Sequence, residues 1–498
     1  MPGLIEKLLT HNYDVNPSAP FLNTPRGEYC YAAIRHRSLI WSSLFQQQNI
    51  KEQDVIAFVI SDPAEFIAAF FGAIRIGAIV LPLDPLIPGV ELQKICTQLK
   101  PKMVLTEGPV PPLDGVGSVR VLKTGELPAS TEGGRYGSLK EYRCLDERRE
   151  ALYLLTSGTT GSPKCIVYTY ERMMNAARLS SKAYGMTTED LVFNAAPLFH
   201  SAGIMPTLAA VESGAQSLCM AKFLPKTFLA MISRHRPSIV KAPAFMYQIV
   251  LKMPRPPACD LGSVRRWYSG SSKLTPDDKE GLLNKYGIRV REMYATTETS
   301  LLAVEQGDGA FIPHLAGIPV ESVKVRIESD GRVAVNSPGA GKGYFICDRR
   351  NSFTVFDPWL FTGDVGYMDK QNRLFITGRA DGQINVAGKK VSTEEVKLVL
   401  AEHPSVCEAE VIGIDDDVSG MGLVAFVVLH HSETAAGLRE FMKHRISDYK
   451  IPKHIILCKS LPRGKLNKVS IHHLKKLFLQ VGQPRASSAE TVAEGSTA

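Results

Sequence analysis

Short apolar runs alternate with longer amphipathic segments over the first hundred residues, and this alternation constrains the fold more than any other feature of the chain. Residues 55–60 form an apolar run typical of a buried strand, and Ser61-Asp62-Pro63 follows as a helix start with proline near the first turn. Strands separated by helices imply a mostly parallel sheet that helices cover on both faces. The further elements expected here are a helix at 64–76, a strand at 78–83, a helix at 91–99 and a strand at 103–105.

The pattern changes after about residue 320. Alternating residues at 323–327 and 332–335 are split by Ser329-Asp330-Gly331, which predicts an antiparallel, hairpin-like region. A small α+β unit of typical domain size is expected beyond residue 380. Its predicted elements are a helix at 392–402 capped by Ser392 or Thr393 and strands at 411–414 and 424–429, and a further strand is expected just before it at 374–377. In the middle of the chain, helical and strand segments are expected to continue through 171–183, 228–233 and 277–286.

The chain has 498 residues, which is too long for one ordinary domain. We therefore expect an α/β protein with a large N-terminal domain of stacked α/β sheets, a β-rich subdomain, and a small C-terminal α+β domain joined by a hinge. The predicted boundaries are 1–379 for the large domain and 380–482 for the small one. Residues 483–498 have few apolar side chains and are expected to be disordered.

Charge and cysteine content exclude several classes of protein. The net charge of +8 comes from 58 basic and 50 acidic residues spread along the chain, which suits a phosphate-rich substrate or an acidic partner. No basic tract is interleaved with aromatic residues, so nucleic-acid binding is not expected. The nine cysteines are scattered without a C-x-x-C pair, which predicts reduced thiols rather than a zinc site or a disulfide framework.

No secretory signal or membrane span is expected. The start of the chain lacks a basic-then-apolar pattern. The most apolar segment, residues 66–83, is interrupted by Arg75 and Pro82 and is better interpreted as a buried helix followed by a strand. A cytoplasmic protein is the simplest expectation.

One loop carries a phosphate-binding pattern. Residues 151–155 predict a buried strand, and the motif that continues from it reads Leu154-Leu155-Thr156-Ser157-Gly158-Thr159-Thr160-Gly161-Ser162-Pro163-Lys164. Glycines let the backbone approach an anion closely, and hydroxyls, N–H groups and one lysine can bind phosphate oxygens. The motif is not a Walker A loop, because Pro163 precedes the lysine and Cys165 follows it. A flexible surface turn is the alternative for the loop taken alone.

Five further segments accompany this loop. They are Pro197-Leu198-Phe199-His200-Ser201-Ala202-Gly203, Met293-Tyr294-Ala295-Thr296-Thr297-Glu298, Phe361-Thr362-Gly363-Asp364, Gly378-Arg379-Ala380-Asp381, and Leu461-Pro462-Arg463-Gly464-Lys465-Leu466-Asn467-Lys468. In this order and spacing the set closely resembles the adenylate-forming superfamily of acyl- and aryl-CoA synthetases, peptide-synthetase adenylation domains and luciferases. The resemblance covers residues 16–477 and implies ATP and Mg²⁺ as cofactors, with 1–379 as the adenylation core and 380–482 as a mobile domain.

The resemblance implies a role for each nucleotide-binding position. Thr297 would contact the α-phosphate region and Glu298 would hold Mg²⁺, a cation that prefers carboxylate oxygen. Asp364 would accept both ribose hydroxyls of AMP, and Arg379 would also touch the ribose. The phosphate loop and the remaining nucleotide contacts would be Thr156, Ser157, Gly158, Thr159, Thr160, Gly161, Lys164 and Tyr294.

The acyl side of the site follows in the same way. His200 would sit beside the acyl pocket and help place the substrate carboxylate, although a lone histidine is more often a satisfied core residue. The pocket would be lined by Gly203, Lys241, Gly270 and Ala295. We expect the Lys241 ammonium to extend to solvent. Were it to reach the pocket instead, a dicarboxylic or otherwise acidic substrate would follow.

Lys468 is the predicted catalytic lysine, which would bridge the substrate carboxylate and the α-phosphate. Lys465 competes for this role because Gly464-Lys465 is a true Gly-Lys pair, but the distance from Leu461-Pro462 favours Lys468. Asp381 matches the hinge residue of the family, and Gly388 would line the path of a thiol.

The chain departs from the family pattern at several positions. Cys165, Ala295 and Asn467 replace glycines and are expected to be tolerated. Asn385 and Ala387 fall where many CoA ligases carry lysines, which puts CoA as acceptor in doubt more than it affects adenylation.

The predicted function is therefore activation of a carboxylic acid to an acyl-adenylate, followed by transfer to a thiol, with CoA as the expected acceptor. A freestanding adenylation enzyme that loads the phosphopantetheine of an acidic carrier protein is one alternative. A non-catalytic protein that binds nucleotide or acyl ligand is the other.

Overall fold

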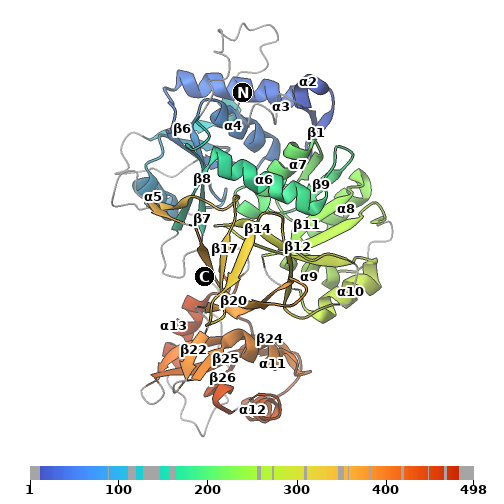
Figure 1. Cartoon of the computed structure of the whole chain (residues 1–498), viewed down its shortest axis with the longest axis vertical. Helices are drawn as coiled ribbons and strands as arrows, with labels where there is room; N and C mark the ends of the chain where they lie inside the picture. The colour runs from blue at the N-terminus through green and yellow to red at the C-terminus, as the bar shows by residue number, and fades with distance from the viewer. Residues whose placement is uncertain are drawn as a thin grey trace. The chain divides into compact units, whose positions relative to one another are not determined.

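The computed structural model describes most of the chain in two compact units (Figure 1). The described residues are 12–87, 89–109, 119–126, 146–156, 164–254, 259–271, 274–307, 311–345, 353–356, 358–380, 383–386, 389–416, 420–446, 448–464 and 468–481. The first unit comprises Met1–Val325 and Val335–Leu360, and the second comprises Arg326–Ala334 and Phe361–Ala498. The domain boundary predicted at 379/380 stays a prediction, and the tail predicted to be disordered lies outside the described residues.

One sheet of the first unit is built around the predicted strand–helix alternation. Its strands lie in the order β19-β18-β8-β7-β4-β3-β5-β6, and those from β7 to β6 are parallel. The other end of the sheet is antiparallel, from β7 through β8 and β18 to β19. The strands are β3 (Val55–Val59), β4 (Ile79–Pro82), β5 (Met103–Thr106), β6 (Arg120–Lys123), β7 (Glu150–Thr156), β8 (Lys164–Thr169), β18 (Gly343–Phe345) and β19 (Phe353–Val355).

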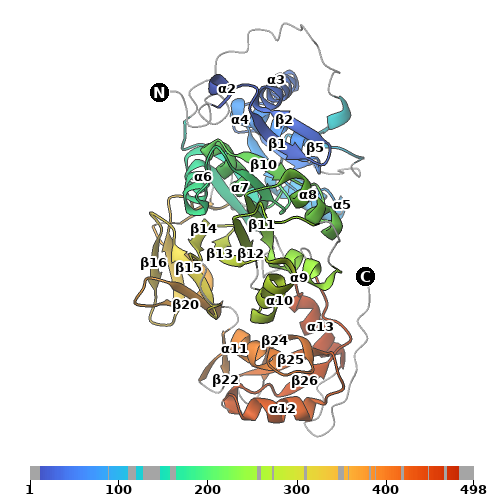
Figure 2. The same cartoon turned by 90° about the vertical axis from the view of Figure 1, so that its right-hand side faces the viewer.

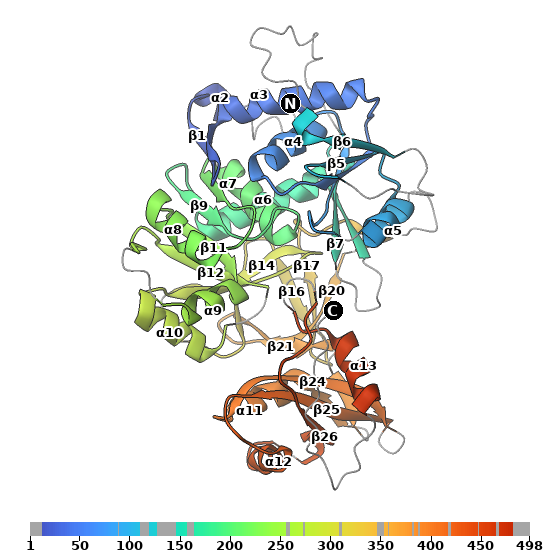
Figure 3. The same ribbon diagram turned by 180° about the vertical axis from the view of Figure 1, so that it is seen from behind.

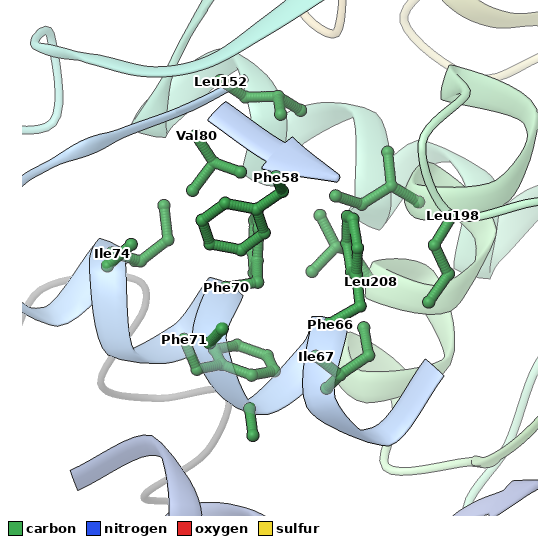
Figure 4. Close-up of a cluster of buried hydrophobic side chains, with 14 of the residues drawn as sticks. Phe58, Phe66, Ile67, Phe70, Phe71, Ile74, Val80, Leu152, Leu198 and Leu208 are labelled. Carbon is green, nitrogen blue, oxygen red and sulfur yellow. The ribbon is translucent and has the colours of Figure 1, made fainter. Parts of the chain in front are cut away.

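The period-two pattern of β3 explains why helices cover both faces of this sheet. Ile56 and Phe58 pack in the core on the face of α4 (Pro63–Arg75), whereas Ala57 and Val59 pack in the core on the face of α5 (Gly89–Leu99). Figure 4 shows the α4 side, where aromatic rings from the helix meet the strand residues. The helix begins as predicted, because the Asp62 carboxylate accepts from the N–H groups of the first turn.

The second sheet of the first unit carries most of the predicted site. Its strands run in the order β15-β14-β13-β12-β11-β9-β10-β1-β2. The stretch from β13 to β1 is parallel, while β14 pairs antiparallel with β13 on one side and with β15 on the other. The strands are β1 (Pro20–Thr24), β2 (Gly27–Cys30), β9 (Leu191–Asn194), β10 (Gln216–Cys219), β11 (Ile239–Pro243), β12 (Arg266–Gly270), β13 (Val290–Thr296), β14 (Ser300–Val304) and β15 (Leu315–Pro319).

Helices of the first unit pack in pairs. The helix α3 (Tyr31–Gln47) runs beside α4, and Gly72 allows the contact because a Cβ there would lie 2.6 Å from the Trp41 Cβ (Figure 3). The helices α6 (Tyr170–Tyr184) and α7 (Ser201–Ser213) also lie side by side (Figure 2). The remaining helices are α2 (Asn12–Val15), α8 (Pro225–His235), α9 (Ala244–Lys252) and α10 (Pro276–Tyr286), with the 3₁₀ turn η2 (Thr124–Glu126).

The second unit has a core on each face of its own small sheet. Along β25 (Gly420–Leu429), Ala425 and Val427 pack with α11 (Thr393–Ala401) and α12 (Ala435–Lys443), while Phe426 faces α13 (Ile471–Val481). Ser392 caps α11, one of the two predicted possibilities. The sheet also contains β22 (Gln383–Val386), β23 (Lys389–Ser392), β24 (Val406–Asp416) and β26 (His454–Leu457), and η4 (Asp448–Lys450) precedes β26.

The predicted hairpin-like region also lies largely in the second unit. The strands β16 (Lys324–Ile327) and β17 (Arg332–Asn336) are neighbours, followed by β20 (Leu360–Met368) and β21 (Leu374–Arg379). The turn between β16 and β17 is closed by Gly331, whose φ of 82° is the left-handed value that glycine supplies without strain. The strand predicted to end at Thr377 continues through Arg379, because it pairs with β20 along that length.

None of the helices in the described part of the chain combines the length and apolar character that a bilayer span requires. The segment 66–83 folds as predicted into a buried helix followed by a strand.

Phe70→Ala tests the α4 core, since this ring is fully buried among the other aromatic residues of the cluster. We expect a loss of about 3–5 kcal/mol in the free energy of unfolding, measured by denaturant titration of the full chain. Leu86→Ala is the control, because Leu86 is 83% exposed and its loss should cost less than about 0.5 kcal/mol. Equal effects of the two substitutions would contradict this packing.

Candidate active site

The predicted phosphate loop joins two paired strands. Thr156 ends β7 and lies directly opposite Lys164, the first residue of β8, in an antiparallel register. Five predicted phosphate contacts, Ser157, Gly158, Thr159, Thr160 and Gly161, lie outside the described residues.

The turn that carries Thr297 and Glu298 connects β13 to β14 and is held from several sides. The Gly341 N–H donates to the Glu298 carbonyl at 2.7 Å, and the Tyr168 hydroxyl donates to the Thr297 carbonyl at 2.7 Å. Within the turn, the Thr299 N–H donates to the Thr296 hydroxyl at 3.2 Å. Burial, and then the nearby Glu298 charge, raise the pKa of Tyr168, so its hydroxyl remains a donor.

Tyr344 links the loop lysine to the predicted metal ligand. Its hydroxyl donates to Glu298 Oε1 at 3.0 Å, and the Lys164 ammonium lies 5.2 Å from the centre of its ring, within the range of a cation–π contact. Tyr344 lies on β18, which pairs with β8 through Ile166. Sequence reasoning missed Tyr344 and Tyr168. The glycines Gly339, Gly341 and Gly343 were the available signal, since a Cβ on Gly341 would lie 2.7 Å from Ile166.

Glu298 is the carboxylate that would hold a magnesium ion, and its surroundings suit a cation that is shared with phosphate. Within the described residues no group of three His, Cys, Asp or Glu side chains gathers to hold a metal alone. Magnesium is commonly held by one or two carboxylates together with substrate phosphates, which matches a single partly exposed carboxylate beside a phosphate loop. Tyr344 orients one carboxylate oxygen of Glu298.

His200 and Gly203 form a tight turn at the start of α7. His200 is the N-cap residue, its N–H donates to the Pro197 carbonyl at 3.1 Å, and its ring centroid lies 4.4 Å from that of Phe199. A Cβ on Gly203 would lie 1.9 Å from the Pro197 oxygen, so no larger residue fits this turn. The Ser201 hydroxyl donates to the Thr297 hydroxyl at 3.4 Å, which brings two predicted motifs together.

The expectation that Lys241 reaches solvent is wrong. The residue is 4% exposed, and its ammonium donates to the Ala202 carbonyl at 2.7 Å. The physical reason lies in Pro206 within α7. The Ala202 carbonyl would accept from the N–H of residue 206 in a regular helix, but proline has none, so the lysine supplies the missing donor. Burial lowers the pKa of Lys241 to about 7.

The other predicted pocket residues lie on neighbouring strands. Gly270 ends β12, and a Cβ there would lie 3.2 Å from the Met293 side chain. Met293 accepts a hydrogen bond at its sulfur from the Tyr184 hydroxyl of α6, at 3.1 Å. Tyr294 and Ala295 follow on β13, at an irregularity in its pairing with β14, and Ala295 is exposed.

The remaining predicted residues belong to the second unit. Asp364 on β20 is 7% exposed and lies opposite Arg379 of β21, so the pairing brings the two predicted ribose contacts together. Lys468 is exposed, and its carbonyl accepts from the Gly464 N–H at 2.8 Å. Lys465 and Asn467, and also Asp381, Ala387 and Gly388, lie outside the described residues, and Asn385 lies on β22.

Comparison with known proteins identifies the family. Residues 9–345 match the family described as AMP-binding enzyme, and residues 395–468 match the AMP-binding enzyme C-terminal domain. The chain belongs to the AMP-binding enzyme family. This confirms the predicted place in the adenylate-forming superfamily and its class, the AMP-forming acid–thiol ligases.

The relatives of this AMP-binding enzyme are CoA ligases at modest identity. The 2-succinylbenzoate–CoA ligase of Geobacillus kaustophilus is 28% identical, with 91% of this chain and 94% of the relative covered. The medium-chain fatty-acid–CoA ligase of Escherichia coli is 26% identical, with 90% and 85% covered.

Solved structures confirm the fold class. ATP-bound MatB from Rhodopseudomonas palustris superposes with a TM-score of 0.85 at 22% identity, covering 96% of this chain and 99% of MatB. The O-succinylbenzoate coenzyme A synthetase of Bacillus subtilis in complex with AMP gives a TM-score of 0.82 at 25% identity, covering 94% and 98%.

The burial of Lys241 predicts a pH-dependent stability. Its pKa is about 7 in the folded chain and 10.5 when unperturbed, so the unfolded chain binds more protons between these values. The free energy of unfolding should therefore rise with pH in this window through Lys241, and Lys241→Met should lack that rise. Denaturant titrations at pH 6, 8 and 9.5 measure the difference between the two proteins. A difference that stays constant across these pH values would contradict the burial of this ammonium.

Proposed function

We propose that this enzyme activates a carboxylic acid with ATP and then transfers the acyl group to the thiol of CoA. In the first step a carboxylate oxygen attacks the α-phosphorus, and the bond to pyrophosphate breaks. In the second step the thiol sulfur attacks the acyl carbon, AMP leaves, and the thiol proton passes to solvent. The mixed anhydride divides one difficult acyl transfer into two easier steps.

The observation that carries the proposal is the cluster around Tyr344. One phenol holds a carboxylate of the β13–β14 turn at its hydroxyl and the ammonium of the phosphate loop at its ring. Lys164 would thus contact the phosphate oxygens of ATP, and Glu298 would contact the cation that those phosphates carry. When bound, Mg²⁺ would neutralise phosphate charge, and Glu298 would hold it.

The other residues of the first unit would place the acid. Thr297, fixed by the Tyr168 and Ser201 hydroxyls, would donate toward the α-phosphate. His200, at the N-terminus of α7, would orient the reacting carboxylate. Gly203 keeps that turn tight, and Gly270 leaves the space that Met293 borders.

In the second unit, Asp364 would accept the ribose hydroxyls beside Arg379. Lys468 would neutralise charge that develops at phosphorus during the first step only. The proposal includes a rotation of the small domain about Asp381, so that Lys468 withdraws and the Gly388 segment meets the thiol.

Pyrophosphate release with a panel of aliphatic and aromatic carboxylic acids tests the adenylation step. Competition between CoA and holo-carrier proteins then tests the acceptor. Thioester formation on CoA supports the proposal, and preferred loading of a carrier protein would replace CoA as the acceptor. Tight ATP binding without pyrophosphate from any acid would show a non-catalytic protein instead.

Lys468→Ala should separate the two half-reactions. We expect adenylate formation to fall about a hundredfold or more, because the developing charge loses its cation, while thioester formation from supplied acyl-adenylate is largely spared. Rapid-quench assays of each step measure this. Lys465→Ala serves as the matched control and should affect both steps weakly. Equal losses in both half-reactions would rule out a moving lysine.

Tyr344→Phe should weaken the use of magnesium and ATP. Loss of the hydroxyl removes a hydrogen bond to a charged carboxylate, which predicts about a tenfold rise in the Mg²⁺ concentration needed for half-maximal pyrophosphate release. Tyr153→Phe is the control, because it removes a tyrosine hydroxyl bonded to Glu150, away from the Glu298 turn. Identical magnesium dependence in both variants would remove Tyr344 from the site.

A further inference from the structure

Lys241 is a buried cation in the middle of a parallel sheet. It lies on β11, in register with Asn194 of β9 on one side and Tyr268 of β12 on the other. Strand residues in register project to the same face, so these three side chains line one surface of the sheet, toward α7.

The hydrogen bonds of this surface explain why a donor is needed at position 241, but they do not explain why that donor carries a positive charge. The Lys241 ammonium donates to the Ala202 carbonyl, and no carboxylate among the described residues lies within 4.0 Å of it. The neighbouring Gly203 carbonyl is satisfied by a neutral group, the Asn194 amide, at 2.6 Å. An amide would therefore suffice for the carbonyl that Pro206 leaves open. A buried ammonium costs free energy unless an anion pairs with it.

The position of the charge connects it to the acyl side of the site. Ala202 follows Ser201, whose hydroxyl contacts Thr297. Farther along the same face of the sheet, Gly270 lies in register with Pro243, two residues after Lys241. Lys241 thus contacts the turn that would hold the reacting carboxylate, and it lies on the strand next to the one whose end would border the rest of the acid.

We propose that Lys241 selects a carboxylic acid that carries a second anionic group, and that its ammonium pairs with that group. This inference rests on the proposed function, because it concerns the acid that this ligase activates. The first carboxylate reacts at phosphorus, and the second group supplies the counter-charge that the described residues do not place near Lys241. A charge-assisted hydrogen bond in a water-poor site strengthens binding and orients the acid.

The test compares matched pairs of acids that differ only in a second carboxylate, such as straight-chain mono- and dicarboxylic acids of equal length and benzoic acid with its carboxy-substituted forms. Pyrophosphate release gives kcat/KM for each acid. For at least one pair, the kcat/KM of the native enzyme should be about 10- to 100-fold higher for the dicarboxylic acid than for the matched monocarboxylic acid. The Lys241→Gln variant keeps a donor for the Ala202 carbonyl and should lose that preference mainly through a higher KM for the dicarboxylic acid.

The controls separate a structural role from a selective one. Lys182→Gln removes an exposed lysine of α6 and should retain the preference. The unfolding temperature of Lys241→Gln reports whether α7 remains anchored, and loss of preference in a variant that stays folded supports the proposal. A native enzyme that prefers plain monocarboxylic acids, or a preference that survives Lys241→Gln, would overturn it. Absence of pyrophosphate with every acid would instead overturn the proposed function.

Discussion

The candidate site depends on the junction between the two sheets of the first unit. Tyr168 of β8 reaches from one sheet to the backbone of the turn after β13 in the other, and its pKa is raised by burial, so it donates over the working pH range. Gly341 and Tyr344 contact the same turn, one at the Glu298 carbonyl and one at its carboxylate. The turn is thereby fixed in both backbone and side chain, and a pre-organised carboxylate needs little rearrangement to meet a ligand.

A second constraint arises inside α7. Pro206 removes a helical hydrogen bond at a point where the neighbouring sheet is close enough to replace it. The replacement fixes the first turn of the helix to β11, and the Asn194 amide fixes the next carbonyl to β9. The position of His200 at the start of this helix is therefore set by the sheet as well as by the helix itself.

Sequence patterns predicted the fold best where one physical rule dominated. The helix α4 was foreseen because Asp62 and Pro63 mark its start and apolar residues fill its length. The antiparallel edge of the first sheet was not foreseen, because a seven-residue loop rich in glycine and hydroxyl groups gives no sign that the strands on either side of it pair. In β21 the last residues were missed because pairing with β20, rather than local propensity, extends the strand.

Motif order pointed to Glu298, Asp364 and Arg379, and the structure brings the latter two opposite each other. The motifs did not include the residues that hydrogen-bond to them and hold them in place. Tyr168 lies on β8 beyond the end of the loop motif, and Tyr344 lies on a strand outside all six motifs, so their hydrogen bonds in the folded chain identify them. For Lys241, the general tendency of lysine to reach solvent failed because a proline four residues after Ala202 created a buried acceptor.

The order of strands in the sheets also bears on how the chain acquires its shape during synthesis. The N-terminal strand β1 pairs with β10, and β8 pairs with β18, so β1 and β8 must each wait for a partner that leaves the ribosome about 180 to 200 residues later. The small sheet of the second unit, by contrast, draws its strands from one short stretch of chain and covers both faces with nearby helices. Early translation intermediates of the large unit thus carry strand edges that stay unpaired until these partners are synthesised.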